Sequence, residues 1–303
     1  MDEARYRSAE QTFWATTGIE PTERLVPLAV SGTNVRVQEV GSGEPVVFIH
    51  GGPNAGSTWV PIVEHFAGFR CLIVDRPGTG LSESYSITDP AAIGDRFVGD
   101  LLDALDLEQS HVVVSSFGGY LALRSAAADP GRIRRMVQMA CPAFVPGMMT
   151  PPFMKMMSVT AVRRILEVLP PNERVGKSIL RQIGHGASID AGKIPDSFFA
   201  WYLALQKYTD TMRNDGDMIG RGGSFWGGFD DSLTLPDELL ASVAAPTLFL
   251  WGADDAFGSE AVAQHVVTLM PDAELQMIPD AGHLPWLDDP EGIGAASAAF
   301  LAA

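Results

Sequence analysis

This chain of 303 residues is poor in cysteine, in basic residues and in long apolar runs, and each shortage excludes a class of protein. Its two cysteines, Cys71 and Cys141, lie in or at the end of apolar strand-like runs, which favours buried free thiols over a disulfide. The 21 basic against 37 acidic residues give a net charge of −16, which disfavours nucleic acid and anionic membranes as partners. No apolar run is long enough to span a bilayer.

The amino terminus lacks a targeting signal as well. It reads Met-Asp-Glu-Ala-Arg-Tyr-Arg, with charges of both signs and no apolar run behind them, which predicts neither a signal peptide nor an anchor. We therefore expect a cytoplasmic protein that has no membrane partner, with a homodimer left open. An apolar content of 46% is enough for one large domain or a domain with an insert.

Short β-rich runs alternate with helical patterns at both ends of the sequence. The patterns predict strands over 35–40, 45–50, 69–75, 111–115, 136–140, 246–251 and 274–278. They predict helices over 56–67, 90–107, 118–128 and 259–269, with a closing helix after Pro290. This alternation indicates an α/β fold, in which helices cover both faces of a mostly parallel sheet.

The pattern changes at Cys141-Pro142, where the strand signal fades. From there to about Pro236 the chain reads as helices broken by proline and glycine. We expect a core domain formed by residues 1–142 and 236–303, and a helical insert over 143–235.

One segment indicates chemistry directly. Residues 111–121 read His-Val-Val-Val-Ser-Ser-Phe-Gly-Gly-Tyr-Leu, a β-branched strand that runs into a serine followed by two glycines. This order places Ser116 on a sharp turn between a buried strand and a helix, where its hydroxyl is accessible and helix-start amides surround whatever it attacks.

A serine hydroxyl needs a base to take its proton and a carboxylate to orient that base. Of the six histidines, His283 follows the last predicted strand in a loop, and the carboxyl ends of parallel strands carry function in such sheets. We expect the other histidines to be structural, with His185 a surface residue of the insert. Asp254 and Asp255 both follow the strand 246–251, and turn chemistry alone explains at least one of them.

These motifs together resemble the α/β-hydrolase superfamily over most of the chain outside the insert. Its histidine loop often reads Gly-His-x-Pro-x-x-x-x-x-Pro, matched by 282–290, and its acid loop Gly-x-x-Asp selects Asp255 over Asp254. The family order of nucleophile, acid and histidine would then be Ser116, Asp255 and His283. The resemblance implies an eight-stranded, mostly parallel sheet with a helical cap inserted after the sixth strand.

Two further loops are similar to those of this family. His50-Gly51-Gly52-Pro53 matches the loop after the third strand, and residues 75–80 match the Asp-x-Pro-Gly-x-Gly turn after the fourth. The resemblance implies an oxyanion hole formed by the backbone N–H groups of Phe117 and Gly52, because Pro53 has no N–H. It implies neither a cofactor nor a metal.

The elbow departs from the family pattern Gly-x-Ser-x-Gly, because Val114 stands two residues before Ser116. Taking Ser115 as the nucleophile fits worse, since Phe117 would then occupy the second glycine position. Epoxide hydrolases and haloalkane dehalogenases of this fold need an elbow aspartate, which is absent. Proline iminopeptidases share the His-Gly-Gly-Pro loop but usually read Gly-Gly-Ser-Trp-Gly at the elbow, so peptidase activity is disfavoured.

The insert begins with a methionine cluster that suits an apolar pocket roof or the interface between cap and core. The expected pocket residues are Met148, Met149, Phe153 and Trp286, whereas Trp201, Tyr202 and Trp226 are expected in the core. These residues predict a largely apolar small-molecule substrate, an ester or a lactone, cleaved through an acyl-serine intermediate. Two alternatives stay open: hydrolysis of a C–C bond in a vinylogous diketone, and a hydrolase-fold binding protein with little turnover.

Overall fold

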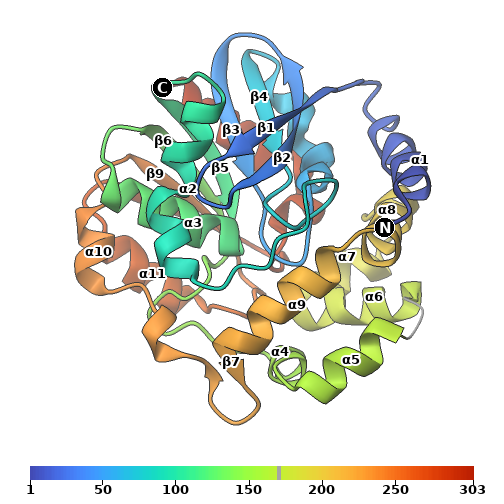
Figure 1. Cartoon of the computed structure of the whole chain (residues 1–303). Helices are drawn as coiled ribbons and strands as arrows, with labels where there is room; N and C mark the ends of the chain where they lie inside the picture. The colour runs from blue at the N-terminus through green and yellow to red at the C-terminus, as the bar shows by residue number, and fades with distance from the viewer. Residues whose placement is uncertain (169–171) are drawn as a thin grey trace.

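The computed structural model describes residues 1–168 and 172–303, and an eight-stranded sheet forms its centre (Figure 1). The strand order is β1-β2-β4-β3-β5-β6-β9-β10. In chain order the strands are β1 Thr22–Leu28, β2 Thr33–Gly41, β3 Glu44–Ile49, β4 Phe69–Val74, β5 Ser110–Ser115, β6 Ile133–Met139, β9 Thr247–Gly252 and β10 Ala273–Ile278. Only β2 runs against its neighbours β1 and β4, while the strands from β4 to β10 are parallel. The predicted α/β class is confirmed.

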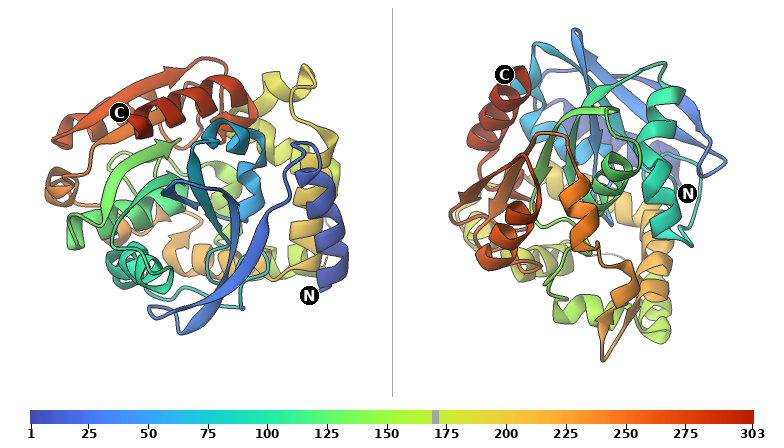
Figure 2. Two further views of the ribbon diagram at one scale, coloured as in Figure 1. Left: turned by 90° about the horizontal axis from the view of Figure 1, so that it is seen from above. Right: turned by 90° about the vertical axis from the view of Figure 1, so that its left-hand side faces the viewer.

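Helices cover both faces of this sheet (Figure 2). Helices α2 Pro90–Ala104, α3 Ser116–Ala128, α10 Asp237–Ser242 and α11 Glu260–Leu269 pack over one face. The 3-10 helix η1 Gly56–Phe66 and α12 Pro290–Ala302 pack over the other. Alternate strand residues serve the two sides: Val112 and Val114 belong to the first buried cluster and Val113 to the second, as the two-residue period of a strand requires.

In the described part of the chain, the α-helices between β6 and α10 form a separate layer beside the carboxyl ends of the parallel strands (Figure 1). They are α4 Pro152–Met157, α5 Thr160–Val168, α6 Glu173–Leu180, α7 Gly186–Asp190, α8 Asp196–Tyr208 and α9 Thr211–Gly222. A short segment, Arg181–His185, joins α6 to α7, and a small hairpin, β7 Gly223–Ser224 and β8 Gly228–Phe229, follows α9. The division at residues 143 and 235 stays a prediction.

An N-terminal helix that the sequence did not predict, α1 Glu3–Trp14, lies alongside α8 (Figure 1). Phe13 stacks on Trp201 of α8 at 5.4 Å between ring centroids, and the Trp201 indole donates to the Tyr6 hydroxyl at 3.2 Å. On its other side, Trp14 donates to Ser57 of η1 at 3.1 Å. Helix α1 therefore contacts both the inserted helices and the body that holds the sheet.

Most predicted elements appear with shifted ends, and the differences have local causes. The helix expected over 56–67 is a 3-10 helix, and Pro61 within it has no N–H for α-helical bonding. Strand β1 was also not predicted: five of its seven residues are exposed and it contains Pro27, which suits an edge strand but hides the alternation. No helix in the described parts of the chain is both long and apolar enough to cross a membrane.

Candidate active site

Ser116 stands at the turn between β5 and α3. Its φ of +49° lies in the left-handed region, which a residue other than glycine adopts only where its surroundings impose it. The loop after β3 lies against this turn: a Cβ on Gly51 would be 2.7 Å from the Cβ of Ser116, and one on Gly118 would collide with the Ile49 carbonyl. Glycine at 51 and 118 thus allows the close approach that exposes the Ser116 hydroxyl.

The valine that departs from the elbow pattern fits without distorting this turn. Val114 is fully buried in the cluster beneath α3, paired between Ile49 of β3 and Gln138 of β6. The tight packing falls instead on the other side of the serine, where Gly119 leaves no space for a Cβ beside the Gln138 amide. The sequence could not reveal this, because it depends on which neighbour approaches which position.

His283 and Asp255 form a buried pair at the carboxyl ends of β10 and β9. Nδ1 of His283 lies 2.9 Å from both carboxylate oxygens of Asp255, and the two side chains are almost completely buried. A carboxylate only accepts, so Nδ1 carries the proton and Nε2 is left as an acceptor. The backbone N–H groups of Cys141 and Phe257 also donate to Asp255, each at 2.9 Å, which fixes the carboxylate.

The structure distinguishes the two aspartates that the residues alone left open. Asp255 is 4% exposed and contacts His283, whereas Asp254 is exposed and bonds through its backbone N–H to the Ala281 carbonyl.

A cavity of about 200 Å³ brings the serine and the histidine to one space. Ser116, His283, Gly52 and Phe117 all line it. Most of its other walls are apolar: Ile87, Phe144, Met148, Phe153, Leu180, Ile183, Met218, Ile219, Phe229, Leu233, Phe257 and Leu284. Among its described lining residues, Arg221 is the only lysine or arginine; it is an exposed residue bonded to Ser86 and to the Ile87 carbonyl.

A cysteine also lines this cavity, Cys141. Burial, and then the negative charge of Asp255, raises the pKa of its thiol well above the usual range. The thiol therefore stays protonated at neutral pH and is a poor nucleophile. Both cysteines are free and buried, as the sequence predicted.

The loop that carries Gly52 is held in place by a buried ion pair, Arg76 with Asp215. Arg76 donates to the carbonyls of His50 and Gly51 at 3.0 and 2.9 Å, and to Asp215 of α9 at 2.9 Å. A Cβ on Gly52 would lie 2.6 Å from the same Asp215 oxygen, so α9 closes directly over this loop. The inserted helices therefore contribute a charge to the support of the loop.

His50 has a structural place in this network, as predicted. Its Nε2 accepts from the Arg76 backbone N–H at 3.2 Å, and its Nδ1 lies 2.6 Å from the Gly51 carbonyl. Burial, and then the nearby Arg76 charge, lowers the pKa of His50 well below its usual range. The ring is thus neutral and orients the loop.

The four predicted pocket residues divide into two groups. Met148 and Phe153 line the cavity, whereas Met149 and Trp286 do not. Met149 is 47% exposed. Trp286 is fully buried, packs against Trp59 at 4.5 Å and donates to the Thr58 carbonyl at 2.9 Å, so it is a core residue. The expectation for Trp286 failed because its position in the loop does not determine the direction in which its side chain points.

Two of the aromatic residues expected in the core lie elsewhere. Tyr202 of α8 lines the cavity, with its hydroxyl 3.4 Å from the Pro53 carbonyl, and Trp226 at the tip of the β7–β8 hairpin is 90% exposed. Trp201 is in the core, as expected. Ile87 and Met218 were missed as cavity residues, since neither belongs to a motif that the sequence displays.

His185 was expected at the surface and is fully buried. Its Nδ1–H donates to Asp288 at 2.8 Å and its Nε2 accepts from the backbone N–H of Leu284 at 3.0 Å. The sequence gave no sign of this contact, because the partners are 103 and 99 residues away.

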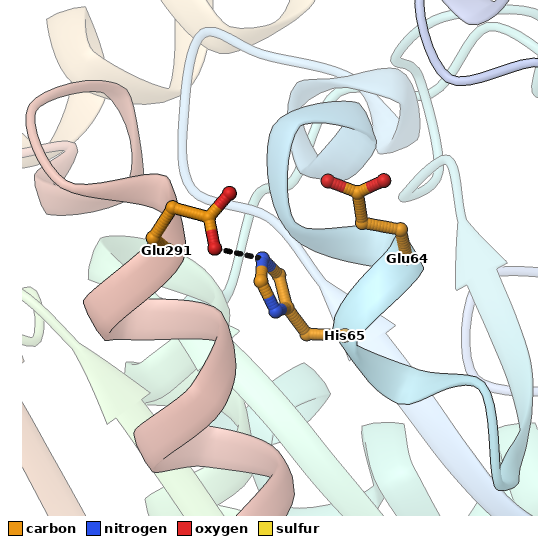
Figure 3. Close-up of side chains that lie close together, drawn as sticks. All are labelled: Glu64, His65 and Glu291. Carbon is orange, nitrogen blue, oxygen red and sulfur yellow. Dashed lines mark ion pairs between the residues drawn. The ribbon is translucent and has the colours of Figure 1, made fainter.

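One group in the described residues, drawn in Figure 3, has the composition of a metal site, and none of its residues lines the cavity. Glu64 and His65 of η1 and Glu291 of α12 come close together there; both glutamates are exposed, and His65 Nε2 is 3.8 Å from Glu291. Such exposed acidic groups are common without an ion.

The sequence matches the model of a protein family described as "Alpha/beta hydrolase family" over residues 46–296. The chain belongs to this family. The match spans β3 to α12, so it includes the parallel strands of the sheet and the inserted helices. The resemblance drawn from the motifs is thereby confirmed.

This hydrolase is similar to named proteins over most of its length. It is 26% identical over 273 residues to a 2-hydroxy-6-oxononadienedioate/2-hydroxy-6-oxononatrienedioate hydrolase of Cupriavidus pinatubonensis, with 86% of this chain and 89% of the other covered. It is 25% identical over 280 residues to a 2-hydroxy-6-oxo-6-phenylhexa-2,4-dienoate hydrolase of Burkholderia cepacia, with 90% and 93% covered. The crystal structure of the carboxylesterase CesB from Bacillus subtilis has the same fold, with a TM-score of 0.76, 19% identity, and 99% and 98% covered.

Proposed function

We propose that this hydrolase cleaves a carboxylic ester or lactone of a largely apolar small molecule through an acyl intermediate on Ser116. The observation that carries the proposal is the cavity itself, which presents Ser116 and His283 together among apolar walls. Residues 143–235 act as a cap over this cavity, since Met148, Phe153, Tyr202 and Met218 all come from them.

The proposed reaction assigns a role to each buried contact. Nε2 of His283 takes the Ser116 proton as the hydroxyl oxygen attacks the carbonyl carbon, and it returns the proton to the leaving alcohol. Asp255 holds Nδ1 protonated and stabilises the imidazolium. The N–H groups of Phe117 and Gly52 stabilise the oxyanion. Water then attacks the acyl group, with His283 again taking a proton.

The charge of the cavity supports an uncharged substrate. A dienedioate carries two carboxylates, and apart from His283 the described lining offers one cation, Arg221, already bonded to Ser86. Asp230 lies in the same lining and repels an anion. Arg76 is neutralised by Asp215 beneath the oxyanion loop and does not line the cavity.

The named relatives favour a second candidate. A 6-oxodienoate has no ester bond, so its hydrolysis breaks a carbon–carbon bond beside the ketone, and two relatives bear the names of such substrates. Ser116 and His283 would serve this reaction with the same geometry. We rank it second because the described lining of the cavity offers no lysine or arginine beyond Arg221 for a substrate carboxylate.

A fluorophosphonate labelling experiment with mass mapping tests the first step. We expect an adduct on Ser116 that the Ser116→Ala variant does not form, while Ser115→Ala still labels. Absence of the adduct in the wild-type protein would contradict an activated nucleophile and favour a binding protein with little turnover.

A substrate panel separates the two candidate reactions. p-Nitrophenyl esters and lactones should turn over with higher kcat/KM than 2-hydroxy-6-oxodienoates with one or two carboxylates. The reverse ranking would replace ester cleavage by carbon–carbon cleavage without changing the site.

A further inference from the structure

The loop that carries His283 has three consecutive backbone N–H groups, each with a separate acceptor. The N–H of Gly282 donates to Asp288 at 2.9 Å, that of His283 to the Ile183 carbonyl at 2.9 Å, and that of Leu284 to Nε2 of His185 at 3.0 Å. Two of these three acceptors belong to the segment between α6 and α7, which lies in the inserted region.

His185 connects this arrangement into one unit. Its Nδ1–H donates to the same Asp288 oxygen that accepts from Gly282, at 2.8 Å. Both ring nitrogens of this fully buried histidine are therefore used, one as donor and one as acceptor. It cannot reach a substrate, because its ring is absent from the cavity lining.

The backbone of the same segment fits against the acid loop too. Gly184 has a φ of +103°, and a Cβ on it would collide with the Asp254 carbonyl and lie 2.7 Å from the Cα of Gly282. The segment thus touches the loop before Asp255 and the loop that holds His283 at one point. Only a glycine allows both contacts.

We propose that the segment Ile183–His185 positions the histidine of the active site, with His185 as a positioning residue that acts through the backbone of Leu284. This inference rests on the proposed role of His283 as the base. Its consequence is that catalysis requires the inserted helices to be packed against the His283 loop. When this segment moves away, the loop loses two of the three acceptors of its backbone N–H groups, while the bond between His283 and Asp255 can remain.

A pair of glycine variants tests the backbone contact. Gly184 and Gly192 both lie in the insert with positive φ, +103° and +66°, but a Cβ on Gly192 would meet nothing within 4 Å. Gly184→Ala should lower kcat by about 10- to 100-fold, the cost of displacing a reacting group by a fraction of an ångström to an ångström. Gly192→Ala also places an alanine at a positive φ, but without a steric contact, and should keep kcat within about twofold. Equal kcat in the two variants would refute the proposal.

Three variants test the side chain. His185→Ala removes the acceptor of the Leu284 N–H and should lower kcat by about tenfold or more with little change in KM. His185→Gln retains an acceptor of similar reach and should restore most of kcat. Asp190→Asn, which breaks only an exposed pair with Arg181, should leave kcat unchanged. Loss of activity in His185→Gln equal to that in His185→Ala would refute the role assigned to Nε2.

Hydrogen exchange at the wild-type amides keeps the proposal testable if a variant does not fold. The N–H groups of His283 and Leu284 should be protected, and His185→Ala should release Leu284 selectively. Exchange of the wild-type Leu284 N–H at the rate of an unprotected amide would overturn the inference. Full activity in His283→Ala would refute the proposed reaction. An inactive His283→Ala together with normal kcat in the His185 and Gly184 variants would refute the positioning role alone.

Discussion

Two buried histidine–aspartate pairs in the described part of the chain differ at the second ring nitrogen. His283 gives Nδ1 to Asp255 and lines the cavity, and among the described residues its Nε2 has no hydrogen-bond partner. His185 gives Nδ1 to Asp288 but also has Nε2 occupied, by the Leu284 N–H. The same chemical pair is therefore a candidate for proton transfer in one place and a support for the backbone in the other. The difference is the partner of the second nitrogen.

The largest expected effect separates the two pairs by their access to Ser116. Replacing Ser116 or His283 by alanine should lower kcat by about a millionfold, the loss expected where a nucleophilic serine and its histidine act as a unit. The Ser116→Ala/His283→Ala double variant should be no worse than either single one. Steady-state kinetics with an ester substrate measures this, and additive losses would contradict a shared proton transfer.

The acid of the first pair gives the next effect. Asp255→Asn should lower kcat by about 10⁴-fold, because an amide favours the wrong tautomer of His283. Asp254→Asn is the matched control: its side chain is exposed and it contacts the loop through its backbone. The order of the two variants in kcat checks the assignment, and a reversed order would move the role to Asp254.

A buried pair without histidine extends the comparison from chemistry to stability. Asp215→Asn leaves the buried guanidinium of Arg76 without its counter-charge and should lower the free energy of unfolding by about 3 kcal/mol. The exposed pair of Arg181 and Asp190 is the control, and Asp190→Asn should leave the denaturation midpoint unchanged. Chemical denaturation of both variants checks this, and equal midpoints would contradict the contribution assigned to Asp215.

The smallest effect concerns pH. Burial and then Arg76 lower the pKa of His50 in the folded protein, so the unfolded chain binds this proton first. The stability contributed by a neutral His50 is present above its ordinary pKa of 6.5 and is lost as the pH falls below that value. Denaturation between pH 7.5 and about pH 5.5 should show this loss, with a shallower dependence in His50→Gln. Identical slopes would contradict it.

The sequence predicted the parts of the site that depend on local pattern. Ser116 and His283 follow β-rich runs and stand at strand ends, so local pattern was enough to select them as candidates, whereas Asp255 was chosen over Asp254 only through the family resemblance. The sheet was predictable for the same reason, since buried parallel strands read as apolar runs.

The rest depends on contacts that no local pattern displays. His185 lies in the segment between α6 and α7 and Tyr202 lies in α8, and the position of each follows from what it faces across the molecule. The expectations for Trp286 and Trp226 failed likewise, because the residue type predicts a tendency toward burial but not which residues the side chain contacts. Helix α1 was missed because only a few of its residues are buried.

The contact between α1 and α8 has a practical consequence for protein engineering. Exchanging residues 143–235 with those of a relative would change the walls of the cavity. The new helices would also have to pack against α1 of this chain, where Phe13 and Tyr6 contact Trp201. A working chimera would have to import the first fourteen residues together with the insert. An affinity tag fused to the amino terminus would lie beside the same junction, where the Asp2 N–H bonds to the Tyr208 carbonyl. Tags therefore belong at the other end of the chain.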